Sequence, residues 1–133
     1  MYIDSPGGDV DAGFAIFDMI RFINAPVYLI GMGLIASAAT LVLLAVDKEF
    51  RIGLPNSRYL IHQPLGGVQG QASDIEIEAK EIQKFKKELY NIISEHSHTP
   101  FEKVWQDSDR NYWMTADEAK EYGMIDNVLK RKK

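Results

Sequence analysis

The stretch from Val27 to Val46 constrains the fold most, because it holds no charged residue and is about as long as a membrane-spanning helix. Gly31 and Gly33 interrupt its first third, and Val27 to Met32 is rich in the aliphatic residues typical of a buried strand. A segment rich in small residues follows, from about Ala36 to Val46. We therefore predict a buried strand and a separate helix, and no membrane span.

The residues before this stretch show the same alternation. Met1 to Asp4 is short and apolar, and is predicted to be a strand that ends in the turn Ser5 to Gly8. Apolar residues recur at near-helical spacing from Val10 to Ile23, which predicts a helix that Asn24 and Pro26 end. Strand, helix, strand, helix is typical of an α/β fold with a parallel sheet.

The middle of the chain is predicted to contain two further strands and the longest helix. The strands, Phe50 to Ile52 and Arg58 to His62, flank a turn-forming Gly-Leu-Pro-Asn-Ser sequence. Pro64 to Ser73 is rich in Gly and Gln, so it is expected to be mobile or to lie extended against another element. From Asp74 to about Glu95, apolar residues form one helical stripe. A helix of this length is expected to project, so its stripe could bury against another subunit.

Two sequences in the C-terminal third are typical of helix starts. Thr99 to Glu102 and Thr115 to Glu118 both match a capping box, so each predicts a short helix. Gly123 suits the left-handed conformation that ends a helix, and Met124 to Leu129 is predicted to return as a last strand. No repeat or linker is visible, so residues 1–133 are predicted to form a single domain.

The composition argues against several classes of function. The chain has no cysteine, which excludes disulfides, thiolate metal sites and cysteine nucleophiles. Its formal net charge of -4 argues against nucleic-acid binding, and the basic run from Lys130 to Lys133 is interpreted as a solvated tail. The N-terminus shows no signal peptide, so a cytoplasmic location is expected.

Ser37, His62 and Asn111 are the side chains best suited to acyl-transfer chemistry, which needs a nucleophile, a base and a group that orients the base. Ser37 lies where a strand meets a helix, whose first N–H groups would stabilise an oxyanion. His62 ends an apolar strand, and the sites of α/β proteins gather at strand ends. Simpler interpretations stay open, because Ser37 could cap the helix and His62 could be a histidine without a catalytic role.

Several motifs resemble the proteolytic subunit of the Clp proteases. The most specific is the run from His62 to Gly67, with its continuation from Gly70 to Ile77. The others are Ser5 to Gly8, Ala36 to Ser37, Leu54 to Arg58, Asp107 to Met114 and Ala116 to Asp126. The resemblance covers essentially the whole chain. It implies an α/β fold, a crotonase-like spiral of βαβ units with a projecting handle helix.

The resemblance also implies roles for individual residues. Ser37 would be the nucleophile, His62 the general base, and Asn111 would stand where the family commonly has the aspartate of its catalytic triad. The implied oxyanion hole is formed by Gly8 and Ala38, the substrate-binding segments by Asp9, Val10, Pro64, Leu65 and Gly66, and the contact between rings by Asp109 and Arg110. The substrate would bind as an added strand. No metal or organic cofactor is implied.

The function implied is that of a serine endopeptidase subunit that cleaves unfolded proteins through an acyl-enzyme. Such subunits form heptameric rings that stack as a double-ring particle, and an AAA+ unfoldase delivers the substrate. Asn111 predicts reduced activity, because an amide supplies no charge to stabilise an imidazolium. Family members begin upstream of Met1, and Leu34 and Ala38 depart from the usual residues beside the nucleophile, where Ala38 would widen the adjacent pocket.

Three alternatives remain. The first is a weak or inactive structural subunit that assembles with an active paralogue. The second is an acyl-CoA-binding protein of the crotonase type, and the third is a membrane-anchored relative with a Ser-Lys dyad. The crotonase interpretation leaves the pair Ser37 and His62 unexplained, and the chain offers no plausible anchor for the third.

Overall fold

The uncharged stretch forms a strand and a separate helix, as predicted. In the computed structural model, which describes residues 1–132, β2 (Leu29–Ala36) starts later than expected and continues through both glycines. Ser37 alone separates it from α2 (Ala38–Leu43). Among residues 1–132, no helix combines the length and the apolar character needed to cross a bilayer.

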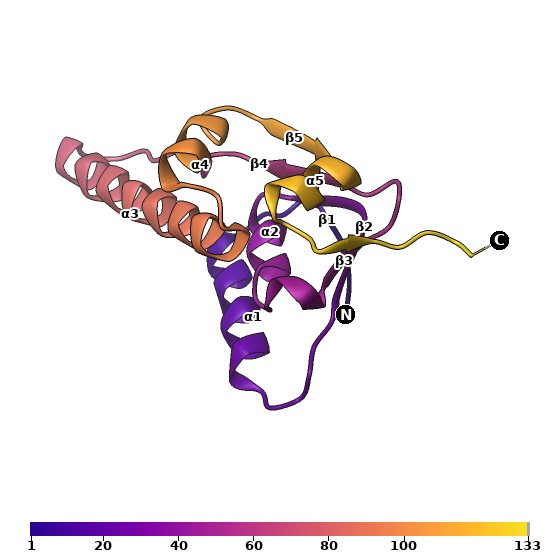
Figure 1. Cartoon of the computed structure of the whole chain (residues 1–133). Helices are drawn as coiled ribbons and strands as arrows, with labels where there is room; N and C mark the ends of the chain where they lie inside the picture. Colours follow the sequence, from indigo (N-terminus) through magenta and orange to yellow (C-terminus); the bar gives the residue numbers. More distant parts are fainter. Residues whose placement is uncertain (133) are drawn as a thin grey trace.

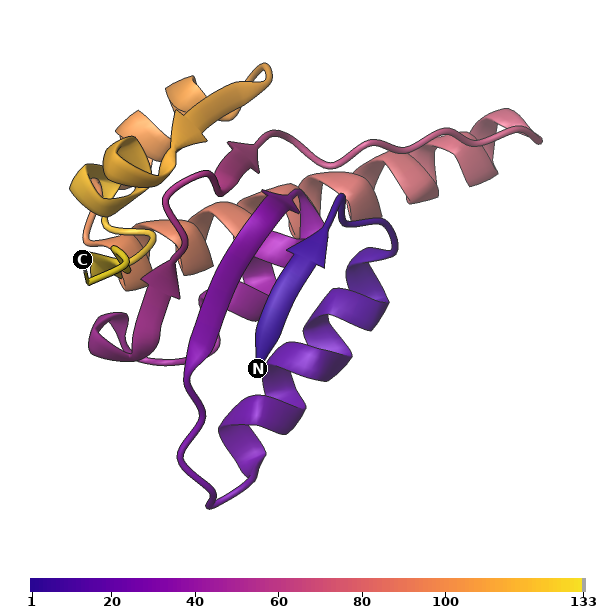
Figure 2. The same ribbon diagram turned by 90° about the vertical axis from the view of Figure 1, so that its right-hand side faces the viewer.

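The strands form one six-stranded sheet in which β2 pairs with β1, β3 and β4 (Figures 1 and 2). Its order is β5-β4-β2-β3-β6, and β1 pairs with β2 off this path. The other bounds are β1 (Tyr2–Ser5), β3 (Arg51–Gly53), β4 (Arg58–Ile61), β5 (Tyr112–Thr115) and β6 (Asn127–Val128). In parallel register, β3 pairs with the first half of β2 and β4 pairs with its second half. The carboxyl ends of β2 and β4 therefore meet at one edge.

The core lies between this sheet and the helices. Every residue of α2 is buried, and α1 (Val10–Phe22) packs against it with Gly13, Phe17 and Ile20 turned inward. Large side chains with no more than 1% exposure include Leu29, Ile35, Leu41, Leu43, Leu44, Tyr59, Ile61, Tyr90, Ile93, Met124 and Ile125. Each aliphatic one contributes roughly 1.5–3 kcal/mol by burial. These contacts fix the strand ends on which the site is built.

The long helix, α3 (Ala72–Ser97), extends past the predicted bounds at both ends. Its fully packed residues, among them Leu89 and Ile93, lie toward its C-terminus, whereas Ile75 and Ile77 near its start are exposed. Figure 2 shows this first part reaching beyond the sheet, with the segment that follows β4 running alongside it. The projecting handle is thus confirmed, and burial of its free stripe against another subunit stays a prediction.

One of the two predicted capping boxes is present. At α5 (Ala116–Tyr122), the Thr115 hydroxyl accepts the Glu118 N–H at 3.2 Å, and the Glu118 carboxylate accepts the Thr115 N–H at 2.8 Å. The box predicted at Thr99 is wrong, because α4 (Phe101–Asp107) begins after Pro100 with no side-chain cap. The Thr99 hydroxyl instead donates to the Tyr122 carbonyl at 2.9 Å, so tertiary structure uses the group that the local pattern assigned to a cap.

The junction of β3 and α3 contains a buried cation. The Arg51 side chain is fully buried and donates from Nη2 to the His96 carbonyl at 2.7 Å. Burial lowers the pKa of Arg51 to about 10, against the opposing effect of Asp47 and Asp126. Burial, then the positive charges of Arg21 and Arg51, lower the pKa of His96 below its ordinary 6.5, although Glu95 and Asp47 act in the opposite direction. His96 is thus held neutral in the fold.

We expect the free energy of unfolding to decrease as the pH falls below about 6.5, the ordinary pKa of a histidine. The unfolded chain takes up a proton at His96 near that pH, whereas the folded protein resists until its lowered pKa is reached. Urea unfolding between pH 8 and 5 measures the slope of the free energy of unfolding against pH. His96→Gln should flatten it, whereas His98→Asn at the exposed helix end should not. An unchanged slope in His96→Gln would assign the pH dependence to other groups.

Candidate active site

Ser37 occupies a strained strand-to-helix turn. Its backbone angles are φ 55° and ψ -123°, a conformation that costs a residue other than glycine about 1–3 kcal/mol. The Ser37 N–H donates to the Leu60 carbonyl at 3.0 Å, and the Ser37 carbonyl accepts the Thr40 hydroxyl at 2.6 Å. Ser37 stands at the N-cap position of α2, but its side chain makes no capping hydrogen bond. The interpretation of Ser37 as a capping serine is therefore wrong, and its role as a nucleophile stays a prediction.

The glycine turn after β1 packs directly on the Ser37 turn. A methyl group at Gly7, which has φ 86°, would lie 2.5 Å from the Ala36 carbonyl and 2.8 Å from Ser37 Cβ. It would also lie 2.9 Å from the backbone nitrogen of Ala38. Only a residue without Cβ fits at position 7. This contact brings Gly8 and Ala38, the expected oxyanion donors, to the same part of the molecule, and their role stays a prediction.

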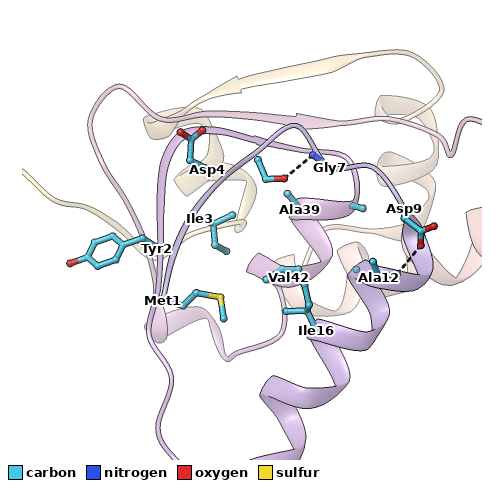
Figure 3. A pocket seen from close by; sticks show the side chains of 13 residues that line it. Met1, Tyr2, Ile3, Asp4, Gly7, Asp9, Ala12, Ile16, Ala39 and Val42 are labelled. Carbon is cyan, nitrogen blue, oxygen red and sulfur yellow. Dashed lines mark hydrogen bonds between the residues drawn. The ribbon is translucent and has the colours of Figure 1, made fainter.

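A hollow of about 430 Å³ opens beside this turn, between β1, α1 and α2. Figure 3 shows Ile16, Ala39 and Val42 around its interior. Asp9 lies at its rim and caps α1, since its Oδ1 accepts the Ala12 N–H at 2.8 Å. The small and aliphatic lining suits an apolar group.

The antiparallel pairing of β4 with β5 brings His62 and Asn111 together. Ile61 pairs with Tyr112, so the next residues outward, His62 and Asn111, face each other, and His62 Nδ1 lies 3.1 Å from Asn111 Oδ1. An amide oxygen only accepts hydrogen bonds, so this one requires the imidazole proton on Nδ1. The lone pair of His62 then lies on Nε2, where a general base needs it.

Ser37 and His62 lie at one edge of the sheet because Ala36 pairs with Leu60 in parallel register. Ser37 follows Ala36 directly and His62 follows Ile61, the last residue of β4, and both Ser37 and His62 are partly exposed. Within residues 1–132, no hydrogen bond joins the Ser37 hydroxyl to the imidazole of His62. The structure therefore brings Ser37, the predicted nucleophile, to the edge that carries His62, the predicted base, and holds His62 to Asn111.

A second hollow, of about 360 Å³, lies around His62 and Asn111. Leu65, Asp109 and Arg110 line it with them, and both Asp109 and Arg110 are exposed to solvent. The segment from Pro64 to Gly66 lies beside α3, where a methyl group at Gly66 would overlap Ile82. The substrate-binding and ring-contact roles of these residues stay predictions. In the described part of the chain, no group of three or more His, Asp or Glu side chains could hold a metal ion.

Sequence reasoning missed the strand that follows Asn111 and the groups that support the loop before this strand. Its residues, Tyr112 to Thr115, are mostly of types favoured in strands, and this composition could have revealed β5. The supporting groups are Gln63, which donates to the Asp109 carbonyl at 2.9 Å, and Lys86, whose Nζ lies 3.4 Å from Gln63 Oε1. A lysine on the apolar stripe of α3 was the available signal for the second group.

The chain is similar to known proteins of one family. The chain matches the Clp protease family model over residues 1–132. It is 59% identical over 133 residues to the ATP-dependent Clp protease proteolytic subunit 2 of Treponema denticola, covering 100% of this chain and 66% of the relative. It is 62% identical over 132 residues to the ATP-dependent Clp protease proteolytic subunit of Bacteroides thetaiotaomicron, covering 99% and 60%.

The fold matches a solved structure as well. An Asn→Asp mutant of ClpP1 from Listeria monocytogenes superimposes with a TM-score of 0.91 at 41% identity, covering 98% of this chain and 72% of that one. The chain spans between 60% and 66% of the length of the two relatives above. A family match over residues 1–132, together with this fold, shows that the chain belongs to the Clp protease family.

Proposed function

We propose that this chain is a serine endopeptidase subunit of an ATP-dependent Clp protease, with activity reduced by Asn111. One observation carries the proposal. The strained Ser37 turn lies at the sheet edge where His62 is held through Nδ1, which leaves Nε2 as a base. Family membership supports the same reaction class.

In the proposed mechanism, His62 Nε2 takes the proton of the Ser37 hydroxyl while Oγ attacks the scissile carbonyl carbon. The resulting oxyanion accepts hydrogen bonds from the backbone N–H groups of Gly8 and Ala38. The C–N bond then breaks, the imidazolium returns its proton to the departing amine, and an acyl-enzyme remains on Ser37. Water, deprotonated by His62, repeats these steps and releases the acid. Asn111 orients the ring throughout but adds no negative charge opposite the imidazolium.

The proposed substrates are unfolded polypeptides that lie as an extended strand between two segments. These segments are Asp9 to Val10 beside the glycine turn and Pro64 to Gly66 beside α3, and exposed backbone groups there would pair with the substrate. The proposed partners are further copies of the chain in heptameric rings, stacked as a double ring through Asp109, Arg110 and the free part of α3, and a AAA+ unfoldase. The unpartnered Ile75 and Ile77 support the contact through α3.

A second candidate is a structural subunit that assembles with an active paralogue. Two observations favour it: the uncharged Asn111, and the missing hydrogen bond between Ser37 and His62 within residues 1–132. Both leave the nucleophile weakly activated in the isolated chain. The two candidates differ in whether Ser37 reacts once the particle has assembled.

Labelling with a fluorophosphonate probe tests the proposed function. We expect slow labelling at Ser37, read by intact mass and peptide mapping. Ser37→Ala should abolish it, and His62→Ala should lower its rate by at least about 10³-fold, because the two groups act as a unit. Ser73→Ala, at an exposed serine remote from this edge, is the matched control and should label like the parent. Particle size is measured on the same samples. Labelling that is insensitive to His62→Ala, or no labelling in assembled rings, would contradict the proposal.

A further inference from the structure

The loop that presents Asn111 is held by polar contacts at two consecutive carbonyl groups. The side-chain N–H of Gln63, the residue after the base, donates to the Asp109 carbonyl at 2.9 Å. The Tyr90 hydroxyl, from α3, donates to the Ser108 carbonyl at 3.1 Å. Ser108 is fully buried, so its carbonyl lies where water does not replace a lost protein donor. The position of Asn111 is therefore set by donors outside its own strand.

Lys86 determines which way the Gln63 amide points. Its side chain is 9% exposed, and its Nζ lies 4.4 Å from the ring centroid of Trp105 and 5.7 Å from that of Tyr90. Within residues 1–132, its one hydrogen-bond partner is Gln63 Oε1, at 3.4 Å. A poorly solvated ammonium group requires an acceptor, so the amide oxygen faces Lys86 and the amide N–H groups face Asp109.

The Tyr90 hydroxyl keeps its proton at neutral pH. Burial, with a smaller effect of Asp109, raises the pKa of Tyr90 to about 12, so its hydroxyl remains a donor to Ser108. The rings of Trp105 and Tyr90, which Lys86 Nζ contacts, favour the position from which it reaches Gln63. The long helix α3 thus supports the Asn111 loop in two ways. Tyr90 contacts the loop directly, and Lys86 acts on it through Gln63.

We infer that Lys86, Gln63 and Tyr90 are positioning residues, which orient His62 by holding the Asn111 loop against α3. None of the three needs to touch a substrate. When the support is lost, Asn111 Oδ1 leaves Nδ1, and the imidazole ring is no longer held with its proton there. The effect on rate rests on the proposed function, whereas the effect on the position of the imidazole proton does not.

The test uses the full chain labelled with ¹⁵N-histidine. The chain has three histidines, and His62→Gln assigns the signal of His62. Gln63→Met keeps the length of the side chain and removes both hydrogen bonds, whereas Gln63→Glu keeps the acceptor for Lys86 and removes the donor to Asp109. We expect both to lower the fraction of His62 protonated at Nδ1, and to slow labelling of Ser37 by about 10-fold, the cost of one supporting hydrogen bond of about 1.4 kcal/mol.

Further variants separate positioning from general stability. Lys86→Met should act like Gln63→Met, whereas Lys86→Arg should keep most of the Nδ1–H fraction of the parent. The double variant Gln63→Met with Lys86→Met should be no worse than either single variant, because both break one chain of contacts. Tyr90→Phe removes only the bond to Ser108 and should give a smaller shift. Gln83→Met and Lys80→Met, exposed on the same helix, are the matched controls.

The outcomes are distinguishable. An unchanged Nδ1–H fraction in Gln63→Met and Gln63→Glu would overturn the inference, whatever the rates. If the parent protein does not label at all, the proposed function fails, and the tautomer measurement still decides the positioning role. If Gln63→Met or Lys86→Met unfolds, as judged by urea titration, Gln63→Glu replaces it as the disruptive variant. An equal shift in the control variants would also overturn the inference, because it would assign the shift to a general disturbance of α3.

Discussion

Asn111→Asp is expected to raise the acylation rate of Ser37 by about 10²- to 10⁴-fold, the reverse of the loss that the opposite substitution causes in a serine protease triad. The two side chains have nearly the same shape, so the contact of 3.1 Å with His62 Nδ1 should persist. The carboxylate adds a negative charge that stabilises the imidazolium formed as Ser37 attacks. Because Asn111 is exposed, the new charge carries little cost of desolvation.

The measurement is the second-order rate of fluorophosphonate labelling, together with kcat and KM for a fluorogenic peptide. The gain should lie in kcat, because the charge acts in the transition state. Asn91→Asp adds the same charge on the exposed face of α3 and is the control. No gain in fully assembled rings would show that the orientation of His62 is not the limiting defect. It would favour the structural subunit.

Gly7→Ala is expected to lower the free energy of unfolding by about 3 kcal/mol or more and to abolish labelling of Ser37. The positive φ of 86° costs an alanine about 1–3 kcal/mol. A methyl group 2.5 Å from the Ala36 carbonyl adds an overpacking cost of about 1–3 kcal/mol. Relief of that overlap must move the turn that holds Ser37, so the nucleophile loses its alignment.

Gly8→Ala is the matched comparison for this change. Gly8 also has a positive φ, of 139°, but a methyl group there would meet nothing within 4 Å. The difference in urea stability between the two variants therefore measures the contact with the Ser37 turn, separated from backbone strain. Equal stability of the two variants would show that the Ser37 turn yields freely and is not held by its glycine neighbour.

Local sequence patterns predicted where Ser37 and His62 lie in the fold. Ser37 and His62 each follow an apolar strand, and parallel strands bring their carboxyl ends to one edge, so the position of both follows from periodicity. The glycine turn at Gly7 was also visible, because its composition departs sharply from that of the flanking strand and helix. These features depend on residues close together in the chain.

The contacts that complete the site depend on residues far apart in the chain. Asn111 reaches His62 through pairing across a sequence separation of 49 residues, which no local pattern encodes. At Thr99 the local pattern predicted a capping box that is absent. The Thr99 hydroxyl instead donates to the carbonyl of Tyr122 in α5. The helical spacing of Lys86 places it on the apolar stripe of α3, but the rings that enclose it, Trp105 and Tyr90, are visible only in the packing.

Because β5 lies at the end of the sheet, the part of the site around Asn111 opens locally more easily than the part around Ser37. Ser37 follows β2, which has paired strands on both sides, whereas Asn111 precedes an edge strand that pairs only with β4 in the described chain. Edge strands exchange their amide protons through small openings that leave the core intact. Opening of β5 alone would therefore separate Asn111 from His62 while Ser37 and the core stay folded.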